Sequence, residues 1–326
     1  MNLQLGIGIT SNPRTWPILD GTVKVEGIDL IPTVLHPSEL FWRQLHFAEF
    51  AVAEMSCSSF LIVTGQGDWR FVGLPIFTTR RFFHTSILVR REAGIETPAD
   101  LKGKRVGVPE YQQTAALWAR GVLQHEFGVA PKDMEFWMER TPDRSHGGAT
   151  GFKPPPGVTV NQIPADKSIG SMMLAGKLDA VLHYLSGRNL VDRSRADLAN
   201  HPDFKYLFPD PRAEGIRFYK KTGLLPINHQ AVVRRDVFER EPWVVLNLIK
   251  AFSKANDIAN ERRVEHVADH LAAGLLSGDA KTALIHHGVK ANRKVIETIA
   301  QYSLEQALTP RLIKVEELYA PSALET

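Results

Sequence analysis

The sequence predicts an α/β protein in which strands alternate with helices around a parallel sheet. Between residues 97 and 182, segments with strand character alternate with helix-like segments, an order typical of parallel sheets. The 326 residues correspond to about two domains at roughly 150 residues each. Apolar residues make up 44% of the chain and charged residues 23%, which is enough apolar surface for a core and excludes a disordered chain.

The first third of the chain favours strands separated by two helices. Apolar residues alternate with polar or small ones over residues 3–9, which is the period of a strand. A helix is expected to open at Pro37 with Ser38 as its cap, and a second apolar helix follows Ser59. The remaining strands of this region are expected at residues 27–34, 50–55, 71–76 and 85–90.

A second unit is expected after Pro98. It starts with a capped turn at residues 97–104 and a buried strand at 105–109. Helices at 115–128 and 168–176 and a strand at 178–182 follow. A strand at 224–233 then returns, and the rest of the chain predicts helices at 242–260, 262–275 and 293–308.

Charge and cysteine content narrow the class of protein. The chain has 39 Lys plus Arg and 36 Asp plus Glu, a net charge of +3, without the clustered basic residues that nucleic-acid binding requires. No run of about 18 apolar residues predicts a membrane span. Cys57 is alone, which excludes an internal disulfide and a Cys-based zinc site. The N-terminus shows no signal-peptide pattern, so we expect a cytoplasmic protein and leave a homo-oligomer open.

Several motifs resemble a known family. Residues 20–30, 50–56 and 97–108 resemble the type II periplasmic-binding-protein fold. More narrowly, Ala53-Glu54-Met55-Ser56, Gly107-Val108-Pro109-Glu110-Tyr111-Gln112 and Thr114-Ala115-Ala116 are similar to the 4,5-dihydroxyphthalate decarboxylase family, as are residues 81–86 and 221–223. The match runs to about residue 260. The chain departs from the family at residues 182–188, where the family has an Arg-Pro-type loop, and this leaves the ring substituents of the substrate open.

The resemblance implies both a fold and an activity. It implies two lobes with mixed sheets flanked by helices, a ligand cleft between the lobes, and C-terminal helices. Lobe one would comprise residues 1–90 and 225–326, and lobe two residues 91–224. The implied activity is decarboxylation of a hydroxylated aromatic acid, 4,5-dihydroxyphthalate, to protocatechuate and CO2. No organic cofactor is required in principle, and the expected partner is a small aromatic carboxylate.

Two helix N-termini and two arginines are candidates for binding that carboxylate. Free N–H groups at the helix starts near Ser56 and Thr114 favour anions, and the guanidinium groups of Arg14 and Arg81 can pair with carboxylates. Simple helix capping and surface arginines are the plainer alternatives. The full set of expected substrate-binding residues is Arg14, Glu54, Ser56, Ser58, Ser59, Arg81, Tyr111, Gln112 and Thr114.

Decarboxylation of the ring calls for a general base and a general acid. A base takes the proton of the para hydroxyl, the ring carbon bearing the carboxylate is protonated, and the dienone then loses CO2. The candidates are His84, His183, His229 and Glu110, each at or near an expected strand end. Glu54 lies among apolar strand residues, so it needs hydrogen bonds or a role in the site. A histidine in the core is the alternative at each position.

Other functions are weighed against this one. His266 and His270 have the i, i+4 spacing of a zinc pair but lack the following Glu, so a solvated helix face is expected there, and likewise at His286-His287; no metal is expected. A non-catalytic solute-binding protein for an aromatic carboxylate remains the main alternative. A pyrimidine-precursor synthase of the thiamine pathway is a second alternative, which the single Cys57 disfavours.

Overall fold

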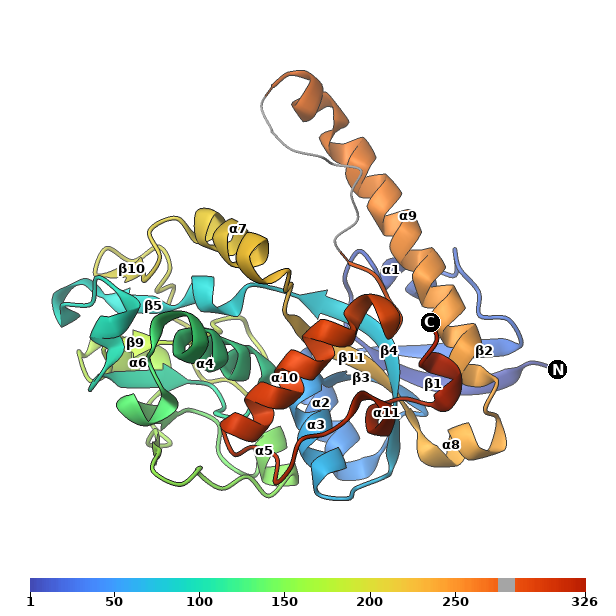
Figure 1. The fold of residues 1–326 in the computed structure, drawn as a ribbon, viewed down its shortest axis with the longest axis horizontal. Helices are drawn as coiled ribbons and strands as arrows, with labels where there is room; N and C mark the ends of the chain where they lie inside the picture. Colours follow the sequence, from blue (N-terminus) through green and yellow to red (C-terminus); the bar gives the residue numbers. More distant parts are fainter. Residues whose placement is uncertain (275–284) are drawn as a thin grey trace.

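Two lobes lie side by side in the computed structural model, which describes residues 1–274 and 285–326 (Figure 1). Each lobe contains one mixed β-sheet flanked by helices. This arrangement confirms the expected two-lobed α/β fold. The strand that opens the chain and the strand at residues 105–109 were expected, and they occupy central or near-central places in the two sheets.

The sheet of the first lobe has the order β2-β1-β3-β11-β4. Its parallel strands are β1 (Leu3–Ile9), β2 (Ile28–Val34) and β3 (Val52–Ser56). The strand β11 (Ile227–Arg234) runs antiparallel to β3 and to β4 (Phe71–Arg80). The carboxyl ends of β1, β2, β3 and β4 therefore meet at one edge of the sheet, where β11 begins.

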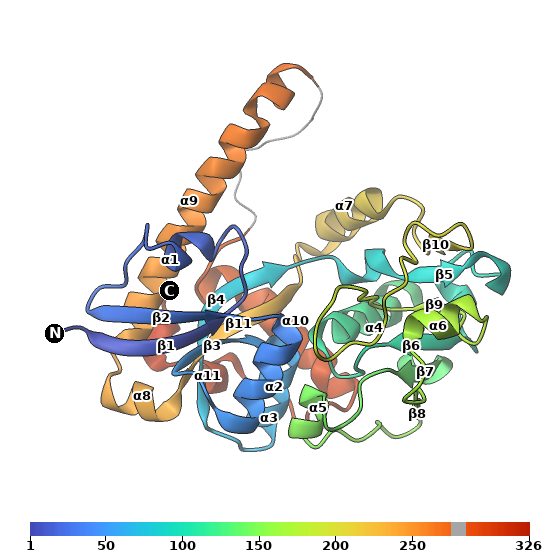
Figure 2. The ribbon, with the colours of Figure 1, turned by 180° about the vertical axis from the view of Figure 1, so that it is seen from behind.

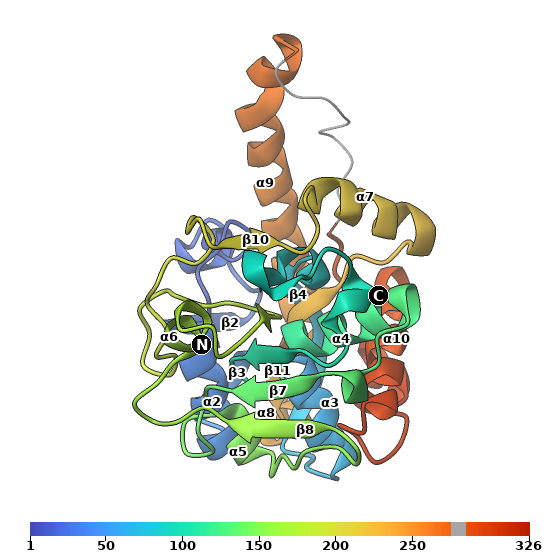
Figure 3. The ribbon, with the colours of Figure 1, turned by 90° about the vertical axis from the view of Figure 1, so that its left-hand side faces the viewer.

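The sheet of the second lobe has the order β10-β5-β9-β6-β7-β8. Strands β6 (Arg105–Val108), β7 (Glu135–Met138), β8 (Thr159–Gln162) and β9 (Ala180–Val181) are parallel. On the other side of β9, the strand β5 (Leu88–Arg90) runs antiparallel to β9. The edge strand β10 (Phe204–Tyr206) runs antiparallel to β5. Figure 3 shows β7 and β8 side by side at the near end of this lobe. Since β5 belongs to this sheet, the second lobe begins just before Leu88.

Helices cover both sheets. The α-helices are α1 (Trp16–Leu19), α2 (Pro37–Phe47), α3 (Cys57–Gly65), α4 (Thr114–Phe127), α5 (His146–Ala149), α6 (Ile169–Leu174), α7 (Pro211–Thr222), α8 (Arg235–Arg240), α9 (Val244–Ala272), α10 (Arg293–Glu305) and α11 (Val315–Leu318). Short 3-10 turns occupy Phe83–Ser86, Arg91–Ala93, Pro98–Leu101, Pro131–Asp133, Lys290–Asn292 and Pro321–Ala323.

The helix α10 bridges the two lobes. It packs against α3 of the first lobe and α4 of the second (Figure 1). The Tyr302 ring of α10 meets the Trp118 ring of α4 edge to face, with 5.4 Å between centroids. Just after α10, the Gln306 side chain accepts a hydrogen bond from Arg120 Nε at 2.8 Å. Besides the two segments that cross between the sheets, α10 is therefore a third connection between the lobes.

Three local expectations are wrong. The cap of α2 is His36, whose Nδ1 accepts from Ser38 N, because Ser38 already lies inside the helix. Only residues 88–90 of the expected strand 85–90 form a strand, since Phe83–Ser86 forms a 3-10 turn. The two helices expected at 242–260 and 262–275 are one helix, α9, because neither Gly nor Pro interrupts it; residue 275 lies outside the described residues.

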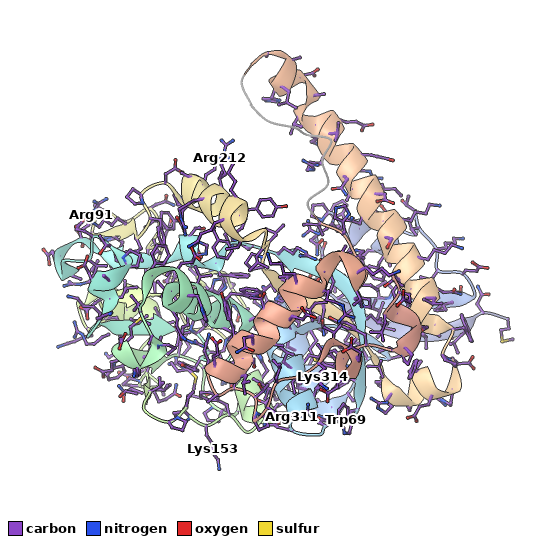
Figure 4. The ribbon with its side chains drawn as sticks, viewed as in Figure 1. Trp69, Arg91, Lys153, Arg212, Arg311 and Lys314 are labelled. Carbon is purple, nitrogen blue, oxygen red and sulfur yellow. The ribbon has the colours of Figure 1, made fainter. Side chains whose placement is uncertain are left out.

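The surface shows a projecting helix and dispersed charges. The far half of α9 extends away from the body in Figures 1 and 2. In the described part of the chain, no helix combines the length and the apolar character that spanning a bilayer requires. Arg91, Lys153, Arg212 and Arg311 are exposed and point outward from separate parts of the body (Figure 4).

Candidate active site

A cavity of about 200 Å³ lies between the lobes, where the parallel strands of both sheets end. It receives side chains from both sheets and from the two crossing segments. Its lining includes five residues expected from the sequence, namely Ser56, Arg81, Thr114, His183 and His229. It also includes His36, Ser38, Phe41, Thr79, Phe83, Gln113, Ala115, Arg140, His146, Leu185 and Asn228.

The first chemical feature of the cavity is the pair formed by His229 and Glu54. His229 stands at the start of β11, directly opposite the end of β3, and its Nδ1 lies 2.7 Å from Glu54 Oε1. The other Glu54 oxygen accepts from Thr10 N at 3.0 Å and Thr10 Oγ1 at 2.6 Å. Burial acts to raise the pKa of Glu54, but these hydrogen bonds and the facing imidazole lower it overall.

Because the Glu54 carboxylate is ionised, it accepts the Nδ1–H of His229 and fixes the orientation of the ring. The remaining nitrogen, Nε2, lies 2.9 Å from Asn228 Nδ2, and both residues line the cavity. An amide N–H donates, so Nε2 is the nitrogen that accepts a proton. The arrangement of carboxylate, imidazole and an unprotonated Nε2 suits general base catalysis.

A second buried network joins His146 to Glu110 across the second lobe. His146 Nε2 lies 2.8 Å from Glu110 Oε2, and Arg140 Nη1 donates to the same oxygen at 2.9 Å. Burial opposes ionisation of Glu110, but His146, Arg140 and the Gly147 N–H lower its pKa to about 2. His146 Nδ1 is also occupied, by Ser59 Oγ of the first lobe at 2.7 Å.

Arg140 is held by groups from both lobes. Its Nε and Nη2 donate to the two oxygens of Asp192 at 2.7 and 2.9 Å, and Nη2 also donates to Ser38 Oγ at 2.6 Å. The guanidinium is thus fixed between two carboxylates. It contributes positive charge to the cavity wall, while its hydrogen-bonding capacity is largely used by the protein.

Two helix N-termini meet at the cavity, as the sequence suggested. Ser56 caps α3, and its Oγ lies 2.8 Å from Thr114 Oγ1 of α4. Thr114 Oγ1 also accepts from Ser58 N at 3.0 Å. No side chain caps the start of α4 at Gln113, so the first N–H groups of that helix remain available near Thr114 and Ala115. These N–H groups can receive a carboxylate.

Two side chains stand out in the wall formed by the crossing segment and the second lobe, namely the positively charged Arg81 and the neutral His183. Arg81 lines the cavity, and within residues 1–274 and 285–326 no ion pair or side-chain hydrogen bond of Arg81 is recorded. His183, which follows β9, packs edge to face on Phe83 at 5.9 Å. Burial, together with the positive charges of Arg81 and Arg140, lowers the pKa of His183 to about 4.

Three of the expected residues lie away from this cavity. Arg14 donates through Nε and Nη2 to the Thr78 carbonyl, at 3.0 and 2.7 Å, and faces a different cavity. His84 is buried and bonds through Nε2 to Glu214 Oε1 at 3.1 Å. Tyr111 is buried with its ring under the Arg120 guanidinium at 3.6 Å. These contacts favour structural roles.

The other expected residues stand directly behind the wall. Glu54 and Glu110 orient His229 and His146. The Gln112 amide donates to Glu110, while Ser59 contacts His146 and the Ser58 N–H holds Thr114. These residues form a supporting layer rather than the wall itself.

Sequence reasoning missed His36, Arg140, His146 and Asn228. His36 lies two residues after β2, and Arg140 lies two residues after β7, so both stand near carboxyl ends of parallel strands. If β7 is recognised as a strand, Arg140 becomes a candidate site residue from the sequence alone. Asn228 is the neighbour of the predicted His229. No three His, Cys, Asp or Glu side chains of the described chain form a cluster suited to a metal ion.

Solved structures of a binding protein and of an enzyme are similar in fold to this chain. The alkanesulfonate-binding protein SsuA from Xanthomonas axonopodis pv. citri, bound to MOPS, is similar with a TM-score of 0.56 and 16% identity, covering 97% of this chain and 98% of that one. The desulfurization enzyme DSZB is similar with a TM-score of 0.54 and 15% identity, covering 98% and 97%. The fold and its cavity therefore define a two-lobed protein of the periplasmic-binding-protein type.

Curated relatives identify the family within this class. The chain is 31% identical over 331 residues to a 4,5-dihydroxyphthalate decarboxylase of Comamonas testosteroni, covering 99% of this chain and 98% of the relative. It is 33% identical over 218 residues to one of Pseudomonas putida, covering 67% and 82%. Residues 72–142 also match the family described as NMT1/THI5 like. The chain belongs to the 4,5-dihydroxyphthalate decarboxylase family, which confirms the resemblance seen in its sequence.

Proposed function

We propose that this enzyme converts 4,5-dihydroxyphthalate to protocatechuate and CO2 in the interlobe cavity. The two named relatives, one of them matched over nearly the full chain, support the reaction and the substrate. The observation that supports the chemistry is the His229–Glu54 pair, which supplies a proton-accepting imidazole nitrogen. The same cavity is lined by the positively charged side chain of Arg81. A cytoplasmic location is part of the proposal and is testable by cell fractionation.

Binding of the substrate uses charge and aromatic packing. One carboxylate pairs with Arg81, and the other accepts N–H groups at the uncapped start of α4 beside Thr114. Phe41, which packs edge to face on His229 at 4.7 Å, and Phe83 supply apolar surface for the ring. The hydroxyl para to the departing carboxylate then lies toward His229.

The reaction proceeds by proton transfer to and from the ring. His229 Nε2 takes the proton of the para hydroxyl, and Glu54 compensates the positive charge that forms on the imidazole. Electrons of the phenolate move into the ring, and the carbon bearing the carboxylate accepts a proton. The C–CO2 bond then breaks, its electron pair restores the aromatic ring, and CO2 leaves. His229 returns its proton to the phenolate oxygen, so one proton is consumed overall.

His183 is the proposed donor of the ring proton. His183 lines the cavity, and its burial and the nearby guanidinium groups hold its pKa at about 4 in the free enzyme, so few His183 side chains are protonated there at neutral pH. The two negative charges of the bound substrate oppose Arg81 and Arg140, and this favours the protonated form once the substrate is in place.

The test is turnover of purified protein with 4,5-dihydroxyphthalate, followed by CO2 release and by product analysis. His229→Asn and Glu54→Gln should each slow kcat by about 10²- to 10⁴-fold, the usual contribution of a general base. His125→Asn is the matched control, because His125 forms a similar pair with Glu305 at 2.6 Å on the exposed side of α4. It should keep normal turnover.

Two results would count against the proposal. Saturable binding of 4,5-dihydroxyphthalate without CO2 release would favour a non-catalytic binding protein. Full turnover in both His229→Asn and Glu54→Gln would keep the reaction and reject this base.

A further inference from the structure

Two consecutive residues at the start of β11, Asn228 and His229, both line the interlobe cavity. Successive side chains of a regular strand point to opposite faces of the sheet, so this placement calls for an irregularity in the strand. The pairing of β11 with β4 contains one. Ile227 pairs with Arg80, and two residues later His229 pairs with Thr79, which is only one residue away from Arg80. Asn228 is therefore an extra residue of β11, as in a β-bulge, and bulges redirect side chains next to active sites.

The bulge places a hydrogen-bond donor beside the proposed base. Asn228 Nδ2 lies 2.9 Å from His229 Nε2. Nε2 is the acceptor of this pair, because the Nδ1–H on the other side of the ring donates to Glu54. The single lone pair of Nε2 accepts one hydrogen bond. A substrate hydroxyl that gives its proton to Nε2 therefore displaces the Asn228 amide.

The displaced amide requires a new acceptor, and a second ring hydroxyl can supply it. Two oxygens on adjacent ring carbons lie about one hydrogen-bond length apart, roughly 2.8 Å. This spacing matches the 2.9 Å between His229 Nε2 and Asn228 Nδ2. A ring with a single hydroxyl takes Nε2 from the amide and offers no acceptor in return. A polar group left without its partner weakens binding, which is how a site rejects an analogue that lacks a hydroxyl.

We infer that Asn228 determines specificity for the second ring hydroxyl, by donating Nδ2–H to the oxygen next to the one that His229 deprotonates. The inference rests on the proposed function and narrows its substrate class. The hydroxyl para to the departing carboxylate meets His229 Nε2, and the adjacent hydroxyl meets Asn228 Nδ2. The cavity thereby selects aromatic dicarboxylates with two adjacent hydroxyls over those with one.

The experiment compares 4,5-dihydroxyphthalate with 4-hydroxyphthalate. The second compound keeps both carboxylates and a hydroxyl para to one of them, so the same reaction would give 3-hydroxybenzoate and CO2. The value of kcat/KM is measured for both compounds with the wild type, Asn228→Ala and Asn228→Leu; leucine is similar in size to asparagine and lacks the donor. In both variants, the ratio of kcat/KM for the dihydroxy compound to that for the monohydroxy compound should fall by about 10- to 100-fold.

Two control variants separate specificity from general damage. Arg81→Gln should lower kcat/KM for both compounds and leave their ratio unchanged, because both carry the carboxylate that Arg81 pairs with. Asn247→Ala is the matched control, since Asn247 Nδ2 donates to the Glu26 carbonyl at 2.9 Å and the residue does not line the cavity. It should leave both values of kcat/KM unchanged.

An unchanged ratio in both Asn228 variants would overturn the inference, even where both rates fall, because a loss shared by the two compounds would show only that Asn228 supports His229. Turnover of neither compound by the wild type would reject the proposed function, and calorimetry would then decide the inference. The wild type should bind 4,5-dihydroxyphthalate about 10- to 100-fold more tightly than 4-hydroxyphthalate, and Asn228→Ala should abolish the difference. Equal binding of the two compounds by the wild type would overturn the inference.

Discussion

When a dicarboxylate binds in the interlobe cavity, His183 should take up a proton. In the free enzyme, burial and the positive charges of Arg81 and Arg140 hold the pKa of His183 at about 4, while Asp192 acts in the opposite direction and His229 adds to the lowering. A bound phthalate brings two negative charges to the same wall. These charges offset the two guanidinium groups and raise the pKa of His183 toward its ordinary value near 6.5.

The size of the effect follows from these two values. At pH 6.5, a group with a pKa of about 4 is protonated in only about 0.3% of molecules, whereas a group with a pKa of 6.5 is protonated in half of them. Full compensation therefore gives an uptake of about 0.5 proton for each phthalate bound. Continued burial of the ring reduces that figure, so about 0.5 is the upper value.

Calorimetry in buffers of different ionisation enthalpy measures this uptake directly. The slope of the apparent binding enthalpy against the buffer enthalpy gives the number of protons exchanged. His183→Asn is the control, because it removes the titrating group while His36, His146 and His229 remain. An uptake in His183→Asn equal to that of the wild type, or none in the wild type despite saturable binding, would refute the reasoning.

Three more predictions concern binding and stability. Arg81→Gln should raise KM about 10- to 100-fold with a smaller change in kcat, because Arg81 binds the carboxylate in the ground state and the transition state alike. Initial-rate kinetics at several substrate concentrations measure this change. An unchanged KM would show that Arg81 does not contact the substrate. Glu110 has a folded-state pKa of about 2 against an ordinary 4.5, so its contribution to the free energy of unfolding is complete above pH 4.5 and is lost as the pH falls toward 2. Urea unfolding across this pH range should show that loss. A loss of the same size in Glu110→Gln would contradict the prediction. Gly121→Ala places a methyl group into the Tyr302 ring and should lower the free energy of unfolding by about 1–3 kcal/mol, whereas Gly187→Ala, with open space around it, should change it by less than about 0.5 kcal/mol.

Strong local patterns made much of the fold predictable from the sequence. The strand β1 alternates apolar with polar or small residues, and β3 and β6 are short buried runs. Glu54 and Ser56 of β3 and Thr114 at the start of α4 were found from these elements. Glu54 was singled out because a carboxylate among apolar strand residues needs partners, and the structure provides Thr10 and His229.

The remaining site residues depend on features that local pattern does not carry. The strands β7 and β8 are four residues long and only partly buried, so their periodicity is weak, and Arg140 and His146 beyond β7 were missed with them. His84 is a candidate because its neighbours, residues 81–86, resemble the family. Its partner Glu214 lies 130 residues further along the chain, and no local pattern could indicate that pairing.

The position of α10 has a consequence for the order in which the protein folds. The second lobe is continuous in sequence up to about residue 222, yet the face of α4 that carries Trp118 is covered by Tyr302 of α10. During synthesis from the N-terminus, more than half of the chain emerges before this cover exists. The core of the second lobe can thus be completed only late, after residue 305 has left the ribosome, and until then its exposed aromatic surface is open to chaperones or to other nascent chains.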